Sequence, residues 1–303
     1  MRRLIILISA FIPLVANAQA LPFIGAEYSP AACAKGGISS VETTSIAYAS
    51  FSNTAVVPFS DQKGDFAAGY TLWQPTLSKV NVISAAGAYN IKNKFGVAGG
   101  FSYGMHPGYE AFDEAGTSKG MFKPSDFMLN LGFSWRFIDW LALGINMEYA
   151  SQKLAESHNY GAVSTDIFLM TKVNGFKGAL GLSNLGTKVT AANGDKFSLP
   201  SSFTAGLGYD CIFAEKHKLD INAELDYYFY KAFSAALGAG YTFNEMISVK
   251  AGYKYGGKSI IPSYASVGAG FRFAGVTLDF AYLMGGASSP MKNTLSIGLG
   301  YRF

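Results

Sequence analysis

The sequence predicts an all-β fold: a transmembrane antiparallel β-barrel of about 14 strands, preceded by an N-terminal hatch or plug segment. Three observations support this prediction. Apolar residues alternate with small or polar ones along segments of roughly 10 to 12 residues, the length of a tilted membrane strand. Charged residues make up only 15% of the 303 residues, while glycine occurs 35 times. After the first residues, no apolar stretch is long enough for a membrane-spanning helix.

Residues 1–18 have the pattern of a secretory signal peptide. Arg2 and Arg3 precede an apolar run, 4–15, which is followed by the small-residue stretch "ANAQA". We expect cleavage after Ala18, or after Ala20 as the second choice, and export of the remaining chain. Loss of the two arginines lowers the formal net charge from +4 to +2. Such a small and unclustered charge does not indicate nucleic-acid binding.

The period-two alternation places strands in order along the chain. The clearest case is 219–227, "LDINAELDY", in which every second residue is apolar or aromatic. Continuing in the same way predicts strands near 66–74, 80–90, 94–104, 126–136, 139–151, 161–172, 176–186, 201–212, 217–228, 232–242, 246–256, 263–273, 276–285 and 293–303. Tight turns alternate with mostly longer loops, as in bacterial outer-membrane barrels, and this phase places the C-terminus on the periplasmic side.

The two faces of these strands differ in a way that favours a membrane barrel over a soluble one. One face carries Phe, Leu and Tyr, whereas the other carries Gly, Ala, Ser and scattered charges. A soluble β-sandwich would need bulky apolar residues on its inner faces. Aromatic residues also gather at strand ends, as they do at membrane interfaces. We therefore expect an integral protein of the bacterial outer membrane, with lipid around residues 63–303.

Residues 19–62 follow neither strand nor helix pattern. The stretch is rich in small residues and only mildly apolar, as in "AEYSPAACAKGGISSVETTSIAYASFSNTAVVPF". It precedes the first strand, so it fills the barrel lumen as a hatch or lies in the periplasm. The sequence leaves both arrangements open.

Several motifs resemble those of one group of proteins. These are "EYSPAACAKGGI" (27–38), "SFSNTAVVPF" (50–59), "GALGLSNLGTKV" (178–189), "LPSSFTAGLGYDC" (199–211) and "LDINAELDYYF" (219–229). In order and spacing they resemble the PorV/PorQ family of Bacteroidetes outer-membrane proteins, which are FadL-like β-barrels. The hatch residues that match the family pattern are Gly36, Gly37, Asn53 and Ala55. Those that depart from it are Glu27, Ser29, Lys35 and Thr54.

The resemblance implies a non-enzymatic role with two main alternatives. The first is a component of type IX-like protein secretion or envelope assembly that works through secretion-system proteins. The second is a FadL-like channel for hydrophobic small molecules such as long-chain fatty acids. A structural barrel without transport is a third alternative. No cofactor is expected, and insertion would require the outer-membrane barrel assembly machinery.

Charged residues on the small-residue face are predicted to point into the lumen. They are Arg136, Glu148, Asp166, Asp210, Asp220, Glu224, Asp226, Lys250, Lys254, Arg272 and Asp279. Both signs are present, so the favoured interpretation is that paired charges fix the barrel interior, because unpaired buried charges are costly. The alternative is a polar pathway or a surface that grips the hatch.

The longest connection, 105–125, carries Tyr109, Phe112, Met121 and Phe122. Loops of this length often serve a function, so these residues are candidate contacts for a ligand or a partner, with a flexible surface loop as the alternative. No catalytic motif is present. The histidines, at 106, 158 and 217, fall far apart, and none has metal-ligand spacing. We expect no disulfide between Cys33 and Cys211.

The phrase Gly-x-Gly-aromatic occurs at 206–209, 238–241, 268–271 and 298–301. Because the glycines lie within predicted strands, a phosphate-binding loop is excluded. We expect Gly298 and Gly300 to face the lumen and leave room for the hatch. The terminal Phe303, with Tyr301, resembles the assembly signal of outer-membrane proteins.

Overall fold

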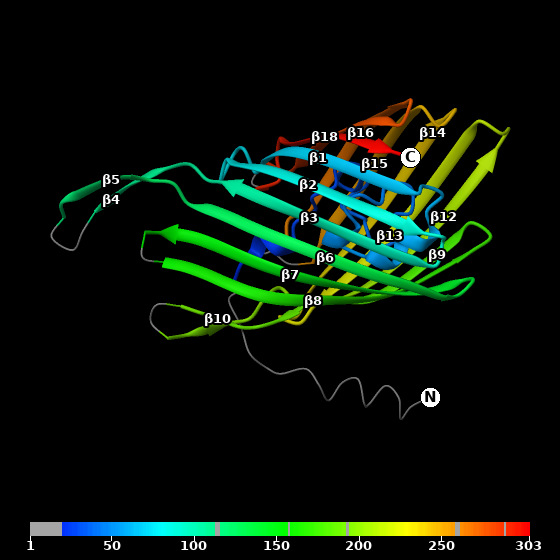
Figure 1. Ribbon diagram of the computed structural model, residues 1–303. Helices are drawn as coiled ribbons and strands as arrows, with labels where there is room; N and C mark the ends of the chain where they lie inside the picture. Colours follow the sequence, from blue (N-terminus) through cyan, green and yellow to red (C-terminus); the bar gives the residue numbers. More distant parts are fainter. Residues whose placement is uncertain (1–19, 113–115, 157, 192–193, 258–260, 288) are drawn as a thin grey trace.

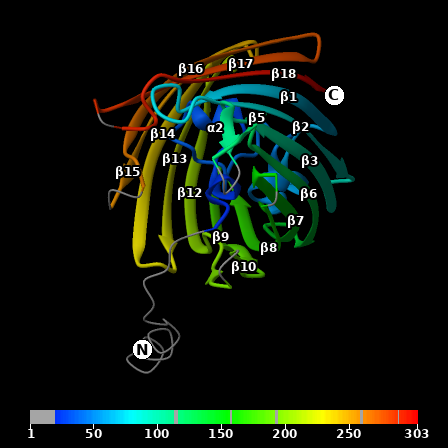
Figure 2. The ribbon, with the colours of Figure 1, turned by 90° about the vertical axis from the view of Figure 1, so that its left-hand side faces the viewer.

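The computed structural model describes residues 20–112, 116–156, 158–191, 194–257, 261–287 and 289–303. Fourteen strands form one closed antiparallel barrel, in the order β1-β18-β17-β16-β15-β14-β13-β12-β9-β8-β7-β6-β3-β2 (Figures 1 and 2). This confirms the predicted fold class. The barrel strands are β1 Gly64–Trp73, β2 Val80–Ile91, β3 Phe95–Met105, β6 Ser125–Ile138, β7 Leu141–Ala155, β8 His158–Val173, β9 Phe176–Gly186, β12 Ser202–Phe213, β13 His217–Tyr228, β14 Ala232–Phe243, β15 Ile247–Gly256, β16 Tyr264–Phe273, β17 Val276–Gly285 and β18 Thr294–Arg302.

The predicted strand positions agree with these bounds. Strands β9, β13 and β17 begin and end as expected, and the largest difference is four residues, at the end of β7. The barrel closes between β18 and β1, where Arg302 lies opposite Asp65 and Leu295 opposite Leu72. Because each strand pairs with its two neighbours around a closed ring, no barrel strand edge is left open to lipid.

Two predicted loops contain strands. The connection 105–125 forms a hairpin of β4 Tyr109–Phe112 and β5 Ser118–Phe122, which projects beyond the barrel (Figure 1). The connection 187–200 holds the short pair β10 Val189–Thr190 and β11 Lys196–Phe197. The β4–β5 hairpin is exposed on both faces. An apolar/polar alternation arises only where one face is buried, so the pattern that located the barrel strands is absent here.

The outer face of the barrel is apolar along its whole height. Leu131 in β6, Leu207 in β12 and Leu237 in β14 are each more than 60% exposed. Asn130, next to Leu131, and Ser234, on the same strand as Leu237, are buried on the inner side. An outward apolar wall around a polar interior is the arrangement of a barrel surrounded by lipid. No helix among the described residues is long and apolar enough to cross a membrane.

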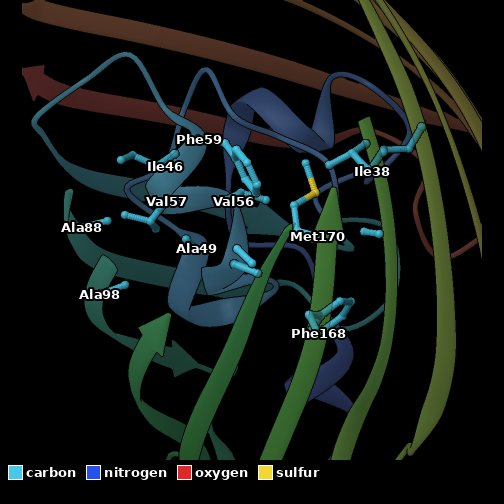
Figure 3. Packing of buried hydrophobic residues seen from close by; sticks show 14 of the residues in the cluster. Ile38, Ile46, Ala49, Val56, Val57, Phe59, Ala88, Ala98, Phe168 and Met170 are labelled. Atoms are coloured by element: carbon cyan, nitrogen blue, oxygen red, sulfur yellow. The ribbon is translucent and has the colours of Figure 1, made fainter. Parts of the chain in front are cut away.

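Residues 20–62 lie inside the barrel. Their short helices are η1 Pro22–Gly25, α2 Pro30–Cys33, η2 Ala49–Phe51 and η3 Thr54–Phe59. Viewed along the barrel, α2 lies within the ring of strands (Figure 2). Ile38, Val56 and Val57 form a buried apolar cluster with wall residues such as Phe168 and Met170 (Figure 3). We refer to residues 20–62 as the inner segment.

The apolar outer face predicts a depth-dependent cost for introduced charge. Leu131 lies at the middle of β6 and is 64% exposed, while Ile247 begins β15 beside a turn and is 53% exposed. Leu131→Arg should destabilise the barrel by about 2–4 kcal/mol, and Ile247→Arg by about 0–1 kcal/mol. Reversible unfolding in lipid vesicles measures both. Equal costs at the two positions would contradict a lipid-facing wall.

Candidate functional site

A cavity of about 510 Å³ lies between the inner segment and the ends of the barrel strands that carry the longer loops. The inner segment contributes Phe23, Glu27 and Tyr28, among others, and the barrel wall contributes residues such as Asp166 and Tyr228. The volume falls in the range of roughly 300–1,000 Å³ that is common for small-molecule sites. This cavity is the candidate functional site.

The backbone of the inner segment is fitted closely to the barrel wall at the predicted hatch residues. Gly36 adopts a φ of 76°, and a Cβ built there would lie 3.1 Å from the Tyr253 carbonyl oxygen. Its N–H donates a hydrogen bond of 2.9 Å to Ser266 Oγ. A side chain at Gly36 would therefore meet both backbone strain and the wall. Gly37 also has a positive φ, of 79°.

The other two predicted hatch residues organise η3. Asn53 caps this helix by accepting a 2.9 Å hydrogen bond from the Ala55 N–H, and its Nδ2 donates to the Ser40 carbonyl at 2.7 Å. The Asn53 side chain thus ties two turns of the inner segment together. Ala55 is fully buried, and its backbone lies against Gly144 of β7. Thr54 contacts Asn146 of the same strand.

A buried ion triad fastens the inner segment to the wall. Lys35 is 3% exposed, and its Nζ pairs with the Glu42 carboxylate and, at 2.8 Å, with Asp220 Oδ1 of β13. Burial lowers the pKa of Lys35, but the carboxylates of Glu42 and Asp220 outweigh this effect and hold the pKa above its ordinary value. The lysine therefore stays charged, and removing it would leave two buried carboxylates without their cation.

All eleven charged residues predicted to face the lumen lie on the inner side of the barrel, and nine of them form two groups. Five contact one another or a further wall lysine; these are Asp210 with Lys177, Lys250 with Asp279, and Lys254 with Asp226. Four contact the inner segment: Arg136 donates to the Pro58 carbonyl, Arg272 to Gln62 Oε1, Asp220 pairs with Lys35, and Glu224 accepts from Ser40 N–H. Some of these charges therefore pair within the wall, and others hold the inner segment.

The remaining two predicted charges, Glu148 and Asp166, are both acidic and buried. Asp166 accepts hydrogen bonds from the Asn184 N–H at 2.7 Å and from Asn146 Nδ2 at 3.4 Å. One oxygen of Glu148, Oε1, has no hydrogen-bond partner among the described residues. These two neighbouring strands, β7 and β8, therefore each place an acidic side chain on the inner wall, and neither acid forms an ion pair with a lysine or arginine within the described part of the chain.

Glu27, in the inner segment, faces the same cavity. Burial raises its pKa to about 7, although a 2.7 Å hydrogen bond from the Ser29 N–H works in the opposite direction. Glu27 therefore changes charge close to neutral pH.

The predicted loop contacts do not line the cavity. Phe112 and Met121 are 59% and 68% exposed on the β4–β5 hairpin. Tyr109 and Phe122 pack against each other, with ring centroids 5.6 Å apart, and the Tyr109 hydroxyl donates to the Leu154 carbonyl at 2.8 Å. The hairpin is thus anchored to β7 at its base, away from the cavity.

The C-terminal residues close the barrel. The Phe303 carbonyl accepts hydrogen bonds from the N–H groups of Lys63 and Gly64, at 2.8 and 2.9 Å, and its ring stacks on Phe66. Tyr301 is exposed on the outer face. Gly298 lies against the inner segment, because a Cβ there would lie 3.0 Å from Pro30. Gly300 differs: its crowding comes from Thr277 and Phe66 of the wall.

Three pairs were not predicted from the sequence. They are Lys35 with Glu42, His106 Nε2 with Asp126 Oδ2 at 2.7 Å, and Arg302 Nε with Asp65 Oδ2 at 3.1 Å. Asp65 also accepts from the Ile46 N–H at 2.9 Å, which links the inner segment to the β18–β1 seam. Lys35, a lysine within a segment of small residues, could have indicated the triad, because a buried lysine requires acidic partners.

Comparison with known proteins identifies the fold rather than a family. No model of a protein family matches the chain, and no curated protein matches its sequence. Similar solved structures include the toluene transporter TbuX of Ralstonia pickettii, with 10% identity, coverage of 92% of this chain and 99% of that one, and a TM-score of 0.61. The toluene transporter TodX of Pseudomonas putida has 13% identity, coverage of 95% and 98%, and a TM-score of 0.62.

A FadL homologue of Pseudomonas aeruginosa is similar at 12% identity, with coverage of 91% of this chain and 98% of that one, and a TM-score of 0.54. The chain therefore shares the barrel fold of FadL-like channel proteins along nearly its full length. The prediction of a FadL-like β-barrel is therefore confirmed for the fold. The names of these structures give no support to the narrower PorV/PorQ assignment.

We expect the ion triad to hold the nearby part of the inner segment against the wall. Lys35→Met should weaken the attachment of residues 35–48 by about 3 kcal/mol, which corresponds to ~100-fold faster amide exchange where exchange occurs by local opening. Hydrogen–deuterium exchange of the detergent-solubilised protein measures this change. Lys250→Met is the matched control, because it removes a wall lysine that pairs with Asp279. Exchange in 35–48 that rises equally in both variants would contradict a specific role for the triad.

Proposed function

We propose that this protein is an integral outer-membrane channel that admits a small, largely apolar molecule through the cavity above the inner segment. The apolar outer wall supports the membrane location. The proposed export route uses residues 1–18 as a cleaved signal peptide; these residues lie outside the described part of the chain. In this arrangement residues 19–62 act as a hatch and residues 63–303 form the membrane domain. The protein carries out no catalysis.

The observation that carries the proposal is the cavity itself. It lies near the loop-bearing ends of the strands, and its lining combines rings such as Phe51, Trp73 and Tyr228 with many polar side chains. Concave sites that place aromatic rings beside convergent polar groups are common sites for small molecules. The similarity to two toluene transporters adds support from the fold. The inner segment lies below the cavity, so passage requires part of it to move.

The alternative, a component of secretion or envelope assembly, remains a prediction that rests on the sequence resemblance alone. It requires secretion-system partners, and the structures to which the chain is similar include transporters and channels. The exposed residues Phe112 and Met121 would be the first place to seek such a partner.

A variant that fills the cavity tests the channel. Ser183 of β9 lines the cavity and points inward, while Leu180 of the same strand is exposed on the outer face. Ser183→Trp should reduce uptake of radiolabelled toluene nearly to the level of cells that lack the protein. Leu180→Trp adds the same ring on the lipid side and should leave uptake unchanged. The measurement uses whole bacterial cells without their own hydrocarbon channels, because lipopolysaccharide limits unassisted entry.

Surface levels of both variants, measured by the heat-dependent gel mobility of the barrel, show whether they fold. Uptake that is equal with and without the wild-type protein would contradict the channel proposal. Undiminished uptake in folded Ser183→Trp would show that the cavity is not the route.

A further inference from the structure

The cavity of about 510 Å³ has an excess of acidic groups in its lining. Its carboxylates are Glu27, Asp126, Asp166, Glu224 and Asp226, whereas the basic side chains among its described lining residues are Lys254 and His106. These acids come from the inner segment and from three strands, β6, β8 and β13, so they surround the space rather than follow one element.

The two basic groups are already engaged. Lys254 Nζ lies 3.4 Å from Asp226 Oδ2, and His106 Nε2 lies 2.7 Å from Asp126 Oδ2. For Glu27, Asp166 and Glu224, no ion pair is found within the described residues. They accept hydrogen bonds from backbone N–H groups, which stabilise a carboxylate but do not neutralise it.

A further acidic residue, Glu148, lies beside the cavity without belonging to its lining. It projects from the inner face of β7, opposite Asn130 of β6 and Ser164 of β8, between the strands that carry Asp126 and Asp166. It is 5% exposed, and its Oε1 has no hydrogen-bond partner among the described residues. A buried carboxylate oxygen without a partner is unusual and costly, and a cation in the adjacent space would lower that cost.

Aromatic rings line the same space. Tyr28 and Phe51 lie with ring centroids 5.0 Å apart, and Tyr228 and Tyr230 with centroids 5.2 Å apart; all four line the cavity. Ring faces attract organic cations, and they also accommodate apolar groups. An ammonium group would therefore find both carboxylates and rings here, while an apolar body would find rings alone.

We propose that the cavity selects an organic cation: a primary amine carried on a small aromatic or aliphatic body. A metal ion fits less well, because no group of three or more metal-binding side chains converges among the described residues. A fatty-acid carboxylate would meet five acidic side chains and only two basic ones among the described lining residues, and such an excess of acidic groups opposes its binding. This inference rests on the proposed function, since it assigns the substrate class of the same cavity.

Three probes of nearly equal size test the selection. They are phenethylamine, propylbenzene and hydrocinnamate, which carry an ammonium, a methyl and a carboxylate group at the same position. Isothermal titration calorimetry with the full protein in lipid nanodiscs, corrected with empty nanodiscs, measures their binding. Phenethylamine should bind roughly tenfold more tightly than propylbenzene, and hydrocinnamate more weakly than either.

Isosteric amide variants test the carboxylates. Glu27→Gln and Asp166→Asn each remove a carboxylate of the lining and keep an oxygen that can accept the same backbone hydrogen bond. Each should weaken phenethylamine binding about fivefold and leave propylbenzene binding unchanged. Asp210→Asn is the control, because Asp210 pairs with Lys177 and does not line the cavity.

The outcomes separate this inference from the proposal on which it rests. Equal or tighter binding of propylbenzene or hydrocinnamate would overturn the selection of cations and leave the channel intact. Loss of phenethylamine affinity in Asp210→Asn equal to that in Glu27→Gln would also overturn it, because the effect would then be long-range charge alone. Binding of none of the probes, together with no protein-dependent toluene uptake, would overturn both.

Discussion

The structure depends on a steric constraint: the side chains on the inner face of the barrel must be small enough to leave room for 43 residues of chain, from 20 to 62. Glycine meets this constraint where the inner segment comes closest to the wall. A Cβ at Gly252 would lie 2.2 Å from the Lys35 carbonyl carbon, and one at Gly144 would lie 2.4 Å from the Ala55 nitrogen. Substitution at either position would push the segment away, because backbone cannot yield as a flexible side chain does.

Apolar packing, as in the cluster of Ile38, Val56 and Val57, is not directional. Buried charge supplies the specificity. Lys35 reaches Asp220 of β13, Glu224 accepts from the Ser39–Ser40 backbone, and Asp65 accepts from Ile46 and Ala47 at the barrel seam. These contacts join the inner segment to two parts of the ring, β13 and the β18–β1 seam. The acidic groups that are not used in this way remain around the cavity, so retention of the segment and the charge of the cavity arise from the same inner face.

Much of the barrel was predictable from the sequence because one rule, apolar outside and small or polar inside, applies to every strand. The rule located β13 and β17 to the residue and assigned all eleven lumen charges to the inner side. It failed for β4 and β5, whose two faces are both in solvent and so show no contrast.

The candidate site was less predictable. The partners Lys35 and Asp220 are 185 residues apart in the chain, and their meeting depends on strand tilt and register, which alternation does not determine. The cavity depends in turn on the path of the inner segment, for which the sequence left the lumen and the periplasm open. Its acidic lining could be seen only after that path was known, because Glu27 lies on the segment and Asp166 on the wall.

The position of the inner segment is the central claim, and a cysteine cross-link tests it most directly. Thr44 Oγ1 lies 3.2 Å from Lys218 Nζ of β13. With Cys33 and Cys211 replaced by alanine, Thr44→Cys paired with Lys218→Cys should be joined by a short bismaleimide in the folded protein. Thr44→Cys paired with Ile221→Cys, which faces outward, should not. Equal linkage of both pairs, or linkage of neither when all cysteines react singly, would contradict an inner segment inside the barrel.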